Sequence, residues 1–463
     1  MNRLPQVLAN VAWWGQPPPS VRAERSSACV FSVSSAHLDS PGRLSPHGNR
    51  HSEDVLVEEA TPNRAISHTK VPFAIIERVT VPEMNTPLQS ALSRVDAPSG
   101  SLTDYRGATT AARFGDLASE FDALRRGCGI YDLGFRAKIS LTGGDRVRWL
   151  NGMVTNNIRD LAEGHGVYAF LLNPQGRILG DMYAYNFGGS VIVDTDHSQV
   201  EKILATFDHY IIMDDVEVEN FSEKVTALGV RGPNSRSILQ GAGLKIPELM
   251  PLQTYRVQCD CECGCLDCTI VRGEDPAHEA YEIWVAPQFV RQLWEALLAA
   301  GATPAGAEAL EMDRIVSGLP LYGIDIRERD LPQETEQDRA LNFSKGCYVG
   351  QEIVERIRSR GNVHRKFTGF VSQNGEPLTS GAKVVVAEAG GEKEVGEVTS
   401  ATPLPGEAMR SVALGYIRRE HAVPHKEVRI GGTTAWVAAL PFAEAAGTGN
   451  DFERKLATQQ AGG

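Results

Sequence analysis

A single cysteine, Cys347, lies in the glycine-flanked stretch NFSKGCYVGQEIVERIRSRG, residues 342–361. Gly346 and Gly350 permit a tight backbone that another group can approach closely. Lys345, two residues before the thiol, would favour the thiolate form. Because this stretch contains no His or Asp, its residues alone do not support an acyl-transfer nucleophile. A nucleophile, a metal ligand and a turn residue therefore stay open as alternatives for Cys347.

Two carboxylates and an arginine are further candidates. Asp181 stands near the start of the second strand of a predicted hairpin that has Tyr168 on its first strand. There it is either a solvated strand-end residue, which periodicity favours, or a base that can orient an amine. Glu282 interrupts the apolar strand YEIWVA, so it either points to solvent by alternation or faces a ligand that shifts its pKa. Arg314 lies in a helix that ends near Gly318. There its guanidinium either binds a ligand carboxylate through two N–H groups or caps the helix.

Five cysteines crowd into the segment CDCECGCLDC, between Cys259 and Cys268. Zinc sites usually pair two CxxC units a dozen or more residues apart, whereas only Cys265 and Cys268 form such a unit here. The segment falls where we expect a hairpin between two strands. We therefore favour accessory thiols over a metal site. The crowding also differs from a disulfide framework, which favours a reducing compartment.

The chain has 463 residues and a formal net charge of −12. A chain of this length normally forms two or three packing units. The negative net charge argues against extensive electrostatic binding to duplex nucleic acid or to an anionic membrane surface. No apolar run reaches the length of a membrane span, so we expect a cytoplasmic protein without stable nucleic-acid or membrane binding.

The pattern of residues 84–365 predicts an α+β region in two parts. Helices are expected within 114–134, where glycine closes the helix, and over 144–153 and 199–212. A hairpin is expected over 166–187 around the turn NPQG, with further strands over 137–143 and 189–196. A second block repeats the theme with a helix over 287–301 and strands over 254–258 and 281–286. This order fits an α+β sheet rather than regular βαβ units.

Residues 366–445 carry six short apolar strands separated by Gly and Pro, which is typical of a small all-β barrel or sandwich. Residues 446–463 read as a flexible tail. Residues 1–83 are rich in Ser, Pro, Arg and His and show no apolar period. They are either upstream sequence before a start at Met84, an organelle transit peptide that would make the protein mitochondrial, or a disordered tail.

The segment KGCYVGQE, residues 345–352, closely resembles the signature loop of the YgfZ-type folate-binding proteins, which are relatives of the glycine-cleavage T-protein (GcvT, aminomethyltransferase). The cysteine separates this branch from the T-proteins. The resemblance spans about residues 105–445. It includes three further segments: VTNN, NPQGRILGD and LPLYGIDI.

The resemblance implies a GcvT-like three-lobed ring, with two α+β lobes around a central folate hole and a C-terminal β-barrel. It implies that tetrahydrofolate or a one-carbon folate derivative is bound by four residues: Tyr168, Asp181, Glu282 and Arg314. It assigns functional roles to Asp181 and Cys347. The remaining residues of the motif loop are Lys345, Gly346, Tyr348, Gly350, Gln351 and Glu352.

The chain departs from the T-protein pattern at two places. The T-protein stretch GYTGEDG reads RGEDPAHEA here, so its tyrosine is missing and Asp275 stands near its place. The paired acids of the T-protein hairpin are Gly180 and Asp181 here. With Cys347, these differences argue against glycine cleavage.

The leading hypothesis is thus a folate-binding accessory protein for iron–sulfur cluster assembly or repair, which supports tRNA modification indirectly. Its partners would be folate and iron–sulfur proteins or their assembly factors. The alternative is a folate-dependent aminomethyltransferase or methyltransferase of the T-protein class. A scaffold that has lost folate is a third possibility.

Overall fold

The fold comes from a computed structural model that describes residues 84–92, 102–261, 264–275, 279–361, 363–373, 376–388, 391–405 and 411–442, with the backbone alone at 258–261, 264–266 and 360. The expectations for residues 1–83 and 446–463, and for most thiols of the five-cysteine stretch, lie outside the described part.

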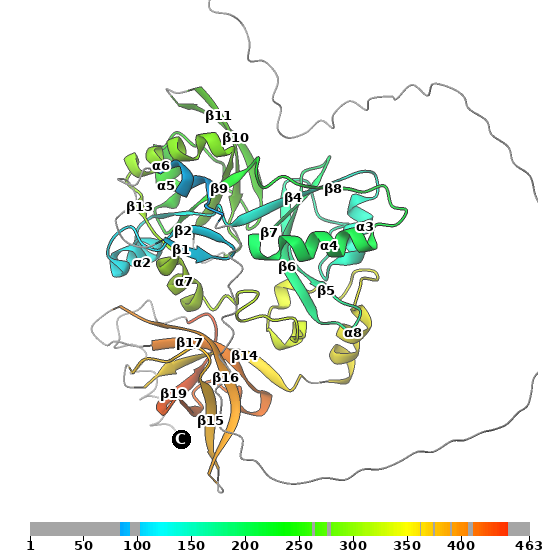
Figure 1. Ribbon diagram of the computed structural model, residues 1–463, viewed down its shortest axis with the longest axis vertical. Coiled ribbons are helices and arrows are strands. Elements are labelled where there is room, and N and C mark those ends of the chain that lie inside the picture. Colours follow the sequence, from blue (N-terminus) through cyan, green and yellow to red (C-terminus); the bar gives the residue numbers. More distant parts are fainter. Residues whose placement is uncertain are drawn as a thin grey trace, which may run out of the picture. The chain divides into compact units, whose positions relative to one another are not determined.

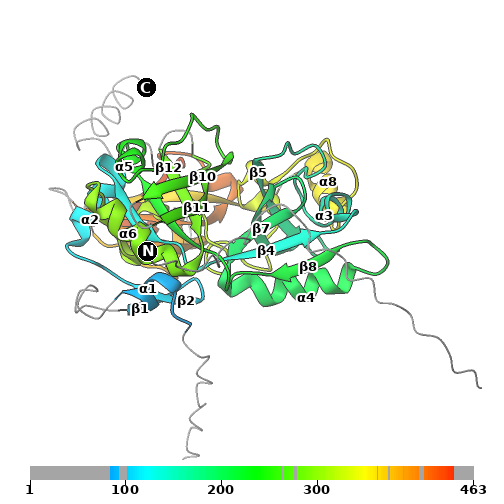
Figure 2. The same cartoon turned by 90° about the horizontal axis from the view of Figure 1, so that it is seen from above.

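The predicted hairpin forms one edge of a five-stranded antiparallel sheet (Figure 1). Alternate residues such as Leu171 and Val193 make one face apolar, and this face packs on α3 and α4. Figure 2 shows α4 running alongside β4 and β8. The strands in spatial order are β5 (His165–Leu172), β6 (Ile178–Asn186), β7 (Val191–Asp196), β4 (Arg136–Thr142) and β8 (Glu217–Asn220). The helices are α3 (Arg146–Met153) and α4 (Val200–Tyr210), which follows the 3₁₀ turn His197–Gln199.

A second sheet has six strands, all antiparallel except for the short edge strand β13, which pairs in parallel with β3. Its apolar face packs on α1 (Pro87–Ala91), α5 (Ser235–Gly241) and α6 (Val290–Ala299). The strands in spatial order are β10 (Thr254–Cys261), β11 (Gly264–Arg272), β12 (Ala280–Val285), β9 (Thr226–Arg231), β3 (Gly129–Asp132) and β13 (Thr303–Pro304). A separate two-stranded sheet pairs β1 (Leu102–Tyr105) with β2 (Ala108–Ala111). Pro287–Phe289 forms a 3₁₀ turn before α6.

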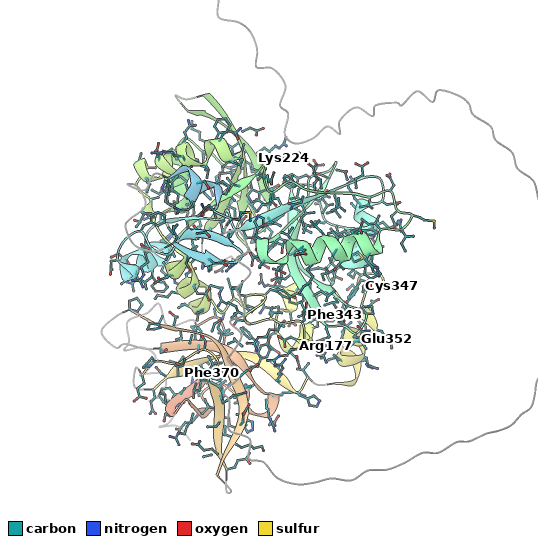
Figure 3. The ribbon with its side chains drawn as sticks, in the orientation of Figure 1. Arg177, Lys224, Phe343, Cys347, Glu352 and Phe370 are labelled. Atoms are coloured by element: carbon teal, nitrogen blue, oxygen red, sulfur yellow. The ribbon has the colours of Figure 1, made fainter. Side chains whose placement is uncertain are left out.

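The six strands expected after residue 366 form a closed barrel. Its interior is lined by alternate apolar residues, among them Phe370, which Figure 3 labels inside the barrel. The strands around the barrel are β14 (Arg365–Ser372), β17 (Ser411–Arg418), β16 (Gly391–Pro403), β15 (Lys383–Glu388), β18 (Glu427–Ile430) and β19 (Thr433–Ala438). Arg419–His421 forms a 3₁₀ turn after β17.

Three helices and two 3₁₀ turns complete the described elements: α2 (Leu117–Arg126), α7 (Ala307–Val316), α8 (Gln351–Arg360), Pro332–Glu334 and Asp338–Ala340. The predicted α+β class with a C-terminal β-barrel is confirmed. The domain boundaries at 84, 366 and 445 stay predictions. Within the described residues, no helix combines the length and apolarity that crossing a membrane requires.

Candidate functional site

The second face of the five-stranded sheet carries charged and aromatic side chains. Residues directly opposite one another on neighbouring strands share a face of the sheet. One such row crosses four strands and contains Tyr168, Tyr183, Asp194 and Lys138. In a neighbouring row, Arg136 stands opposite Asp196. A buried sheet face with so many ionisable groups is typical of a functional site.

The cations of this face are paired with aspartates. Lys138 Nζ lies 2.7 Å from Asp194 Oδ1, and both side chains are almost completely buried. The Arg136 guanidinium lies 3.0 Å from Asp194 Oδ2 and 2.6 Å from Asp196 Oδ1. Burial raises the pKa of Asp194, but its contacts with Arg136 and Lys138 outweigh burial and bring the pKa below its usual value. Asp194 is therefore a fixed negative charge.

Asp181 is held on the same face by two hydrogen bonds. The Tyr168 hydroxyl donates to Asp181 Oδ2 at 2.6 Å, and Gln199 Nε2 donates to Oδ1 at 2.7 Å. Gln199 Oε1 in turn accepts the backbone N–H of Asp181 at 3.0 Å. Burial, followed by repulsion from Asp196, raises the pKa of Asp181. The carboxylate is thus oriented and ready to accept a proton or an N–H hydrogen bond.

Glu282 reaches the same region from β12 of the second sheet. The Trp284 indole donates to Glu282 Oε2 at 2.9 Å. The Trp284 ring packs edge-on against Tyr185 with a centroid distance of 5.3 Å, and Lys138 Nζ lies 4.6 Å from its centroid. Burial, followed by repulsion from Asp194, raises the pKa of Glu282. Glu282 therefore faces the first sheet.

We call these six residues the intersheet cluster: Arg136, Lys138, Asp181, Asp194, Asp196 and Glu282. Arg136 lowers the pKa of both Asp181 and Glu282, so one guanidinium acts on carboxylates of both sheets. Direct ion pairs to the cluster cations go to Asp194 and Asp196, which leaves Asp181 and Glu282 as the carboxylates with a raised pKa. The structure thus brings together three of the four predicted folate contacts: Tyr168, Asp181 and Glu282.

Arg314, the fourth predicted contact, lies in a different network. Its side chain is 5% exposed, and it pairs with Glu311 and with Asp325 Oδ2, 2.6 Å away. It also donates to the carbonyl of Leu319 and, at 2.9 Å, to Ser400 Oγ on β16. Nε, Nη1 and Nη2 together make five contacts, equal to the number of guanidinium N–H donors. A ligand carboxylate could bind Arg314 only if one of these contacts broke.

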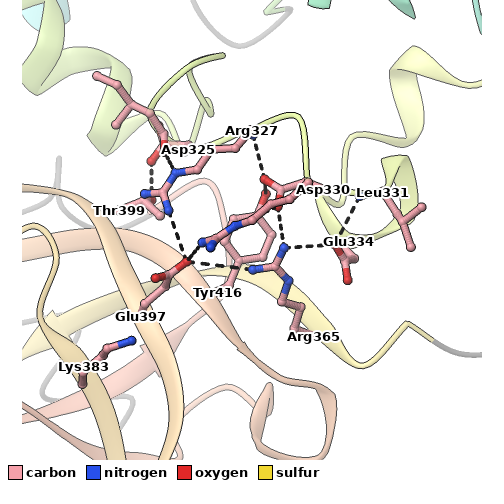
Figure 4. A network of polar contacts seen from close by, with 12 residues as sticks. Asp325, Arg327, Asp330, Leu331, Glu334, Arg365, Lys383, Glu397, Thr399 and Tyr416 are labelled. Carbon is pink, nitrogen blue, oxygen red and sulfur yellow. Dashed lines mark hydrogen bonds and ion pairs between the residues drawn. The ribbon is translucent and has the colours of Figure 1, made fainter. Parts of the chain in front are cut away.

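We call the surroundings of Arg314 the barrel junction, defined by Glu311, Arg314, Asp325, Thr399 and Ser400. Asp325 is fully buried and accepts hydrogen bonds from the hydroxyls of Thr399 and Ser400. Figure 4 shows Asp325 and Thr399 there, next to a second group of ion pairs that joins Asp330 to Arg365. These contacts attach residues 311–330 to the barrel.

In the motif loop, Lys345 is buried against the turn VTNN. Its ammonium donates to the backbone carbonyls of Asn151, Val154 and Asn156 at 2.5, 2.6 and 2.7 Å. Burial, followed by the charge of Arg159, lowers the pKa of Lys345 to about 7. These three carbonyls occupy the N–H donors of the ammonium, so Lys345 is directed at the turn and not at the Cys347 thiol, whose thiolate it was predicted to favour.

The two glycines of the motif loop differ in what they require. Gly350 caps α8 with a φ of +82°, and a Cβ there would lie 2.6 Å from the backbone oxygen of Asn173 in the NPQG turn. The close approach predicted for Gly350 is thus present, and it ties α8 to the hairpin of Asp181. A Cβ at Gly346 would meet no described atom within 4 Å.

Cys347 is an exposed free thiol. Figure 3 shows it at the periphery of the molecule, and Glu352 of the same loop lies in the first turn of α8. Tyr348 is buried, with its ring centroid 5.0 Å from Lys345 Nζ, and Gln351 begins α8. The structure therefore separates the thiol on the surface from the buried carboxylates of the intersheet cluster.

Sequence reasoning missed the paired charges. Arg136 and Lys138 alternate in RAKISLT, and Asp194 and Asp196 alternate in VIVDTD, so period-two spacing was a usable signal. Gln199, which orients Asp181, had no comparable signal because it follows the strand in a 3₁₀ turn.

The five-cysteine stretch lies mostly outside the described side chains. The backbone of β10 and β11 forms the expected hairpin, and Cys268 is buried in the second core. Among the described residues, no three His, Cys, Asp or Glu side chains are grouped as a metal site requires. The preference for accessory thiols stays a prediction.

These features define an α+β protein with a buried cluster of charged side chains between two sheets and a C-terminal barrel. The sequence pattern of the GCVT N-terminal domain matches residues 93–345, more than half of the chain. The protein therefore belongs to the GCVT family.

Named relatives agree with this assignment. The aminomethyltransferase of Streptomyces coelicolor is 30% identical over 357 residues, which cover 74% of this chain and 93% of the relative. That of Thermoanaerobacter pseudethanolicus is 25% identical over 284 residues, covering 60% and 76%. The crystal structure of glycine cleavage system aminomethyltransferase T from Bartonella henselae has a TM-score of 0.68 at 22% identity, covering 78% of this chain and 98% of that one. This likeness shows the shared fold.

Proposed function

We propose that the protein binds tetrahydrofolate, or a one-carbon derivative of it, at the intersheet cluster and takes part in folate-dependent one-carbon transfer. The observation that carries the proposal is the pair Asp181 and Glu282. Both are oriented carboxylates with a raised pKa, and tyrosine and tryptophan rings surround them. The aminomethyltransferase relatives support this class of transfer.

The residues fit a reduced pterin. Carboxylates recognise its ring N–H and amino donors, as they recognise other N–H donor pairs, and aromatic rings can pack against its flat part. Asp181 and Glu282 receive no direct ion pair from the cluster cations, so a ligand rich in N–H donors would stabilise their charged forms. A strongly anionic group at the same point would be repelled.

Asp181 would orient an N–H group of the ligand and accept its proton. Tyr168 and Gln199 fix the two oxygens of Asp181, so the carboxylate can orient an N–H group without losing side-chain entropy on binding. Its raised pKa suits transient acceptance of that proton. When bound, tetrahydrofolate supplies the amine nitrogen that carries the one-carbon unit.

Calorimetric titration of tetrahydrofolate under anaerobic conditions tests binding. We expect the wild type to bind and Asp181→Asn to bind about 10- to 100-fold more weakly, because a charged hydrogen bond contributes about 1.5–3 kcal/mol. Asp160→Asn, on an exposed loop, is the matched control and should bind normally. No binding by folded wild type at millimolar tetrahydrofolate would refute the site.

Transfer is tested separately with methylated amine and sulfonium donors. Formation of a one-carbon folate adduct that depends on the protein and on Asp181 is the expected result. Binding without any adduct would leave a folate-binding protein that lacks transfer.

A second candidate function is support of iron–sulfur cluster enzymes through Cys347, with tRNA modification as an indirect consequence. The exposed thiol in the KGCYVGQE loop favours it, because a transient mixed disulfide or cluster contact needs an accessible sulfur. We expect Cys347→Ala to keep folding and folate affinity but to lose rescue of cluster-enzyme activity in a deletion strain. Ser344→Ala, an exposed neighbour in the loop, is the control. Full rescue by Cys347→Ala would refute this role.

A further inference from the structure

Arg314 and Arg339 are two arginines that could hold an acid group of the ligand, and they differ in how many of their N–H groups already have a protein acceptor. Arg314 is 5% exposed and all five of its N–H donors have protein acceptors. Arg339, in the 3₁₀ turn Asp338–Ala340, is 29% exposed. Its Nε donates to Gln337 Oε1 at 3.0 Å and its Nη1 to the Tyr183 hydroxyl at 3.4 Å. Within the described part of the chain, Nη2 donates no hydrogen bond.

Arg339 lies directly beside the intersheet cluster. Its guanidinium carbon is 4.2 Å from the centroid of Tyr168, the residue that hydrogen-bonds Asp181. Asn156 fixes the backbone by donating its amide to the carbonyl oxygens of Tyr168 and Arg339, at 2.9 and 2.8 Å. Arg339 is therefore a positioned cation over the ring that flanks the proposed ligand.

One carboxylate already occupies this cation. Glu274, in the segment after β11, forms an ion pair with Arg339 through Oε2, and the same oxygen accepts a hydrogen bond from Tyr183 at 3.0 Å. A guanidinium and a phenol thus converge on one carboxylate oxygen, which is the donor arrangement of a carboxylate-binding site. The Glu274 side chain is 24% exposed, so it can leave without opening a buried cavity.

We propose that Arg339 and Tyr183 bind the carboxylate of the ligand's glutamate tail, and that Glu274 holds this position until the ligand displaces it. The inference rests on the proposed function, because it assigns the second end of the same ligand. It also explains how a folate acid group is held while Arg314 stays in the barrel junction. Glu274 thus competes with the ligand carboxylate for the Arg339 guanidinium and the Tyr183 hydroxyl. When Glu274 leaves, both donors are free to bind the ligand.

Anaerobic calorimetry with tetrahydrofolate and with tetrahydropteroate, which lacks the glutamate, tests the assignment. We expect the wild type to bind tetrahydrofolate more tightly. Arg339→Gln should weaken tetrahydrofolate binding about 10- to 100-fold and leave tetrahydropteroate unchanged, because only the former loses a charged hydrogen bond. Glu274→Gln should bind tetrahydrofolate several-fold more tightly than wild type, since an amide competes less well for a guanidinium.

Arg358→Gln is the matched control, since that guanidinium also stacks on a ring, Phe343 at 4.4 Å, but outside the site. Equal weakening of both ligands by Arg339→Gln, or weaker tetrahydrofolate binding by Glu274→Gln, would overturn the inference and leave the proposed function standing. Failure of the wild type to bind either ligand would overturn the proposed function itself. If Arg339→Gln does not fold, Glu274→Gln decides alone, because a purely structural ion pair predicts no gain in affinity.

Discussion

The intersheet cluster and the barrel junction are both buried and both ionic, yet their charges are balanced differently. In the barrel junction, every N–H donor of Arg314 has an acceptor, and Asp325 is held by that guanidinium and two hydroxyls. In the intersheet cluster, Asp181 and Glu282 have a raised pKa, and the neighbouring cations form their ion pairs with other carboxylates. A satisfied network is what structure alone requires, whereas incompletely neutralised carboxylates indicate a place for a ligand.

The largest effect on stability is expected from a substitution that breaks the barrel junction. Asp325→Asn should lower the free energy of unfolding by about 3–5 kcal/mol, because Arg314 loses its fully buried charged partner and keeps only the partly exposed Glu311. Urea denaturation checks this. Glu388→Gln, which removes an exposed pair with Lys393, is the control and should change stability by less than about 1 kcal/mol. A loss below 1 kcal/mol at Asp325 would show that the junction is not a structural ion pair.

The next effect concerns the link between the motif loop and the site. Lys345→Met should lower the free energy of unfolding by about 2–3 kcal/mol, because three buried carbonyls lose their donor. Cys347→Ala in the same loop should stay within about 0.5 kcal/mol, since the side chain is exposed. Urea denaturation measures both variants. Equal stabilities would contradict a stabilising role for the three hydrogen bonds from Lys345 to backbone carbonyls.

The smallest effect on stability is expected inside the intersheet cluster. Asp181→Asn keeps the shape of the side chain, so the free energy of unfolding at pH 7 should equal that of wild type or exceed it by up to about 1 kcal/mol. A clear loss of stability there, with no loss of tetrahydrofolate affinity, would make Asp181 a structural residue like Asp325.

The pH dependence of that variant has a defined sign. The folded protein raises the pKa of Asp181 above its unfolded value, so the folded state holds the proton more tightly. The wild type therefore loses stability as pH rises from the unfolded pKa through the folded one. Asp181→Asn does not lose stability in this way. Its free energy of unfolding should therefore exceed that of wild type by an amount that grows between about pH 4 and pH 7. Urea denaturation across this range measures it, and an advantage that shrinks with rising pH would contradict the raised pKa.

Much of the fold could be predicted because it depends on local periodicity. The hairpin around NPQG, the helix of Val290–Ala299 and the six barrel strands follow directly from alternation and turn residues. The environment of Glu282 could not be predicted, because alternation fixes which residues share a face but not what that face meets. The resemblance to folate-binding relatives pointed to Glu282 where periodicity left two alternatives.

The two lysines show the same limit. Lys345 looked like a partner of the Cys347 thiol because the two are close in sequence, but its three donors reach a turn almost two hundred residues earlier. Lys138 gave no functional signal, yet it lies between Asp194 and the Trp284 ring of the other sheet. Spacing along the chain cannot show contacts of this length.

The sequence by itself determined the strands, the alternation of charges in RAKISLT and VIVDTD, and the position of Cys347 in a glycine-flanked loop. Only the tertiary structure decided that Glu282 and Trp284 of the second sheet face the charged side of the first sheet. It also decided that all N–H groups of Arg314 bind acceptors near the barrel and that Arg339 lies over Tyr168. The physical reason is that backbone periodicity is set by neighbouring residues. Charge compensation, by contrast, depends on every element that packs against the group.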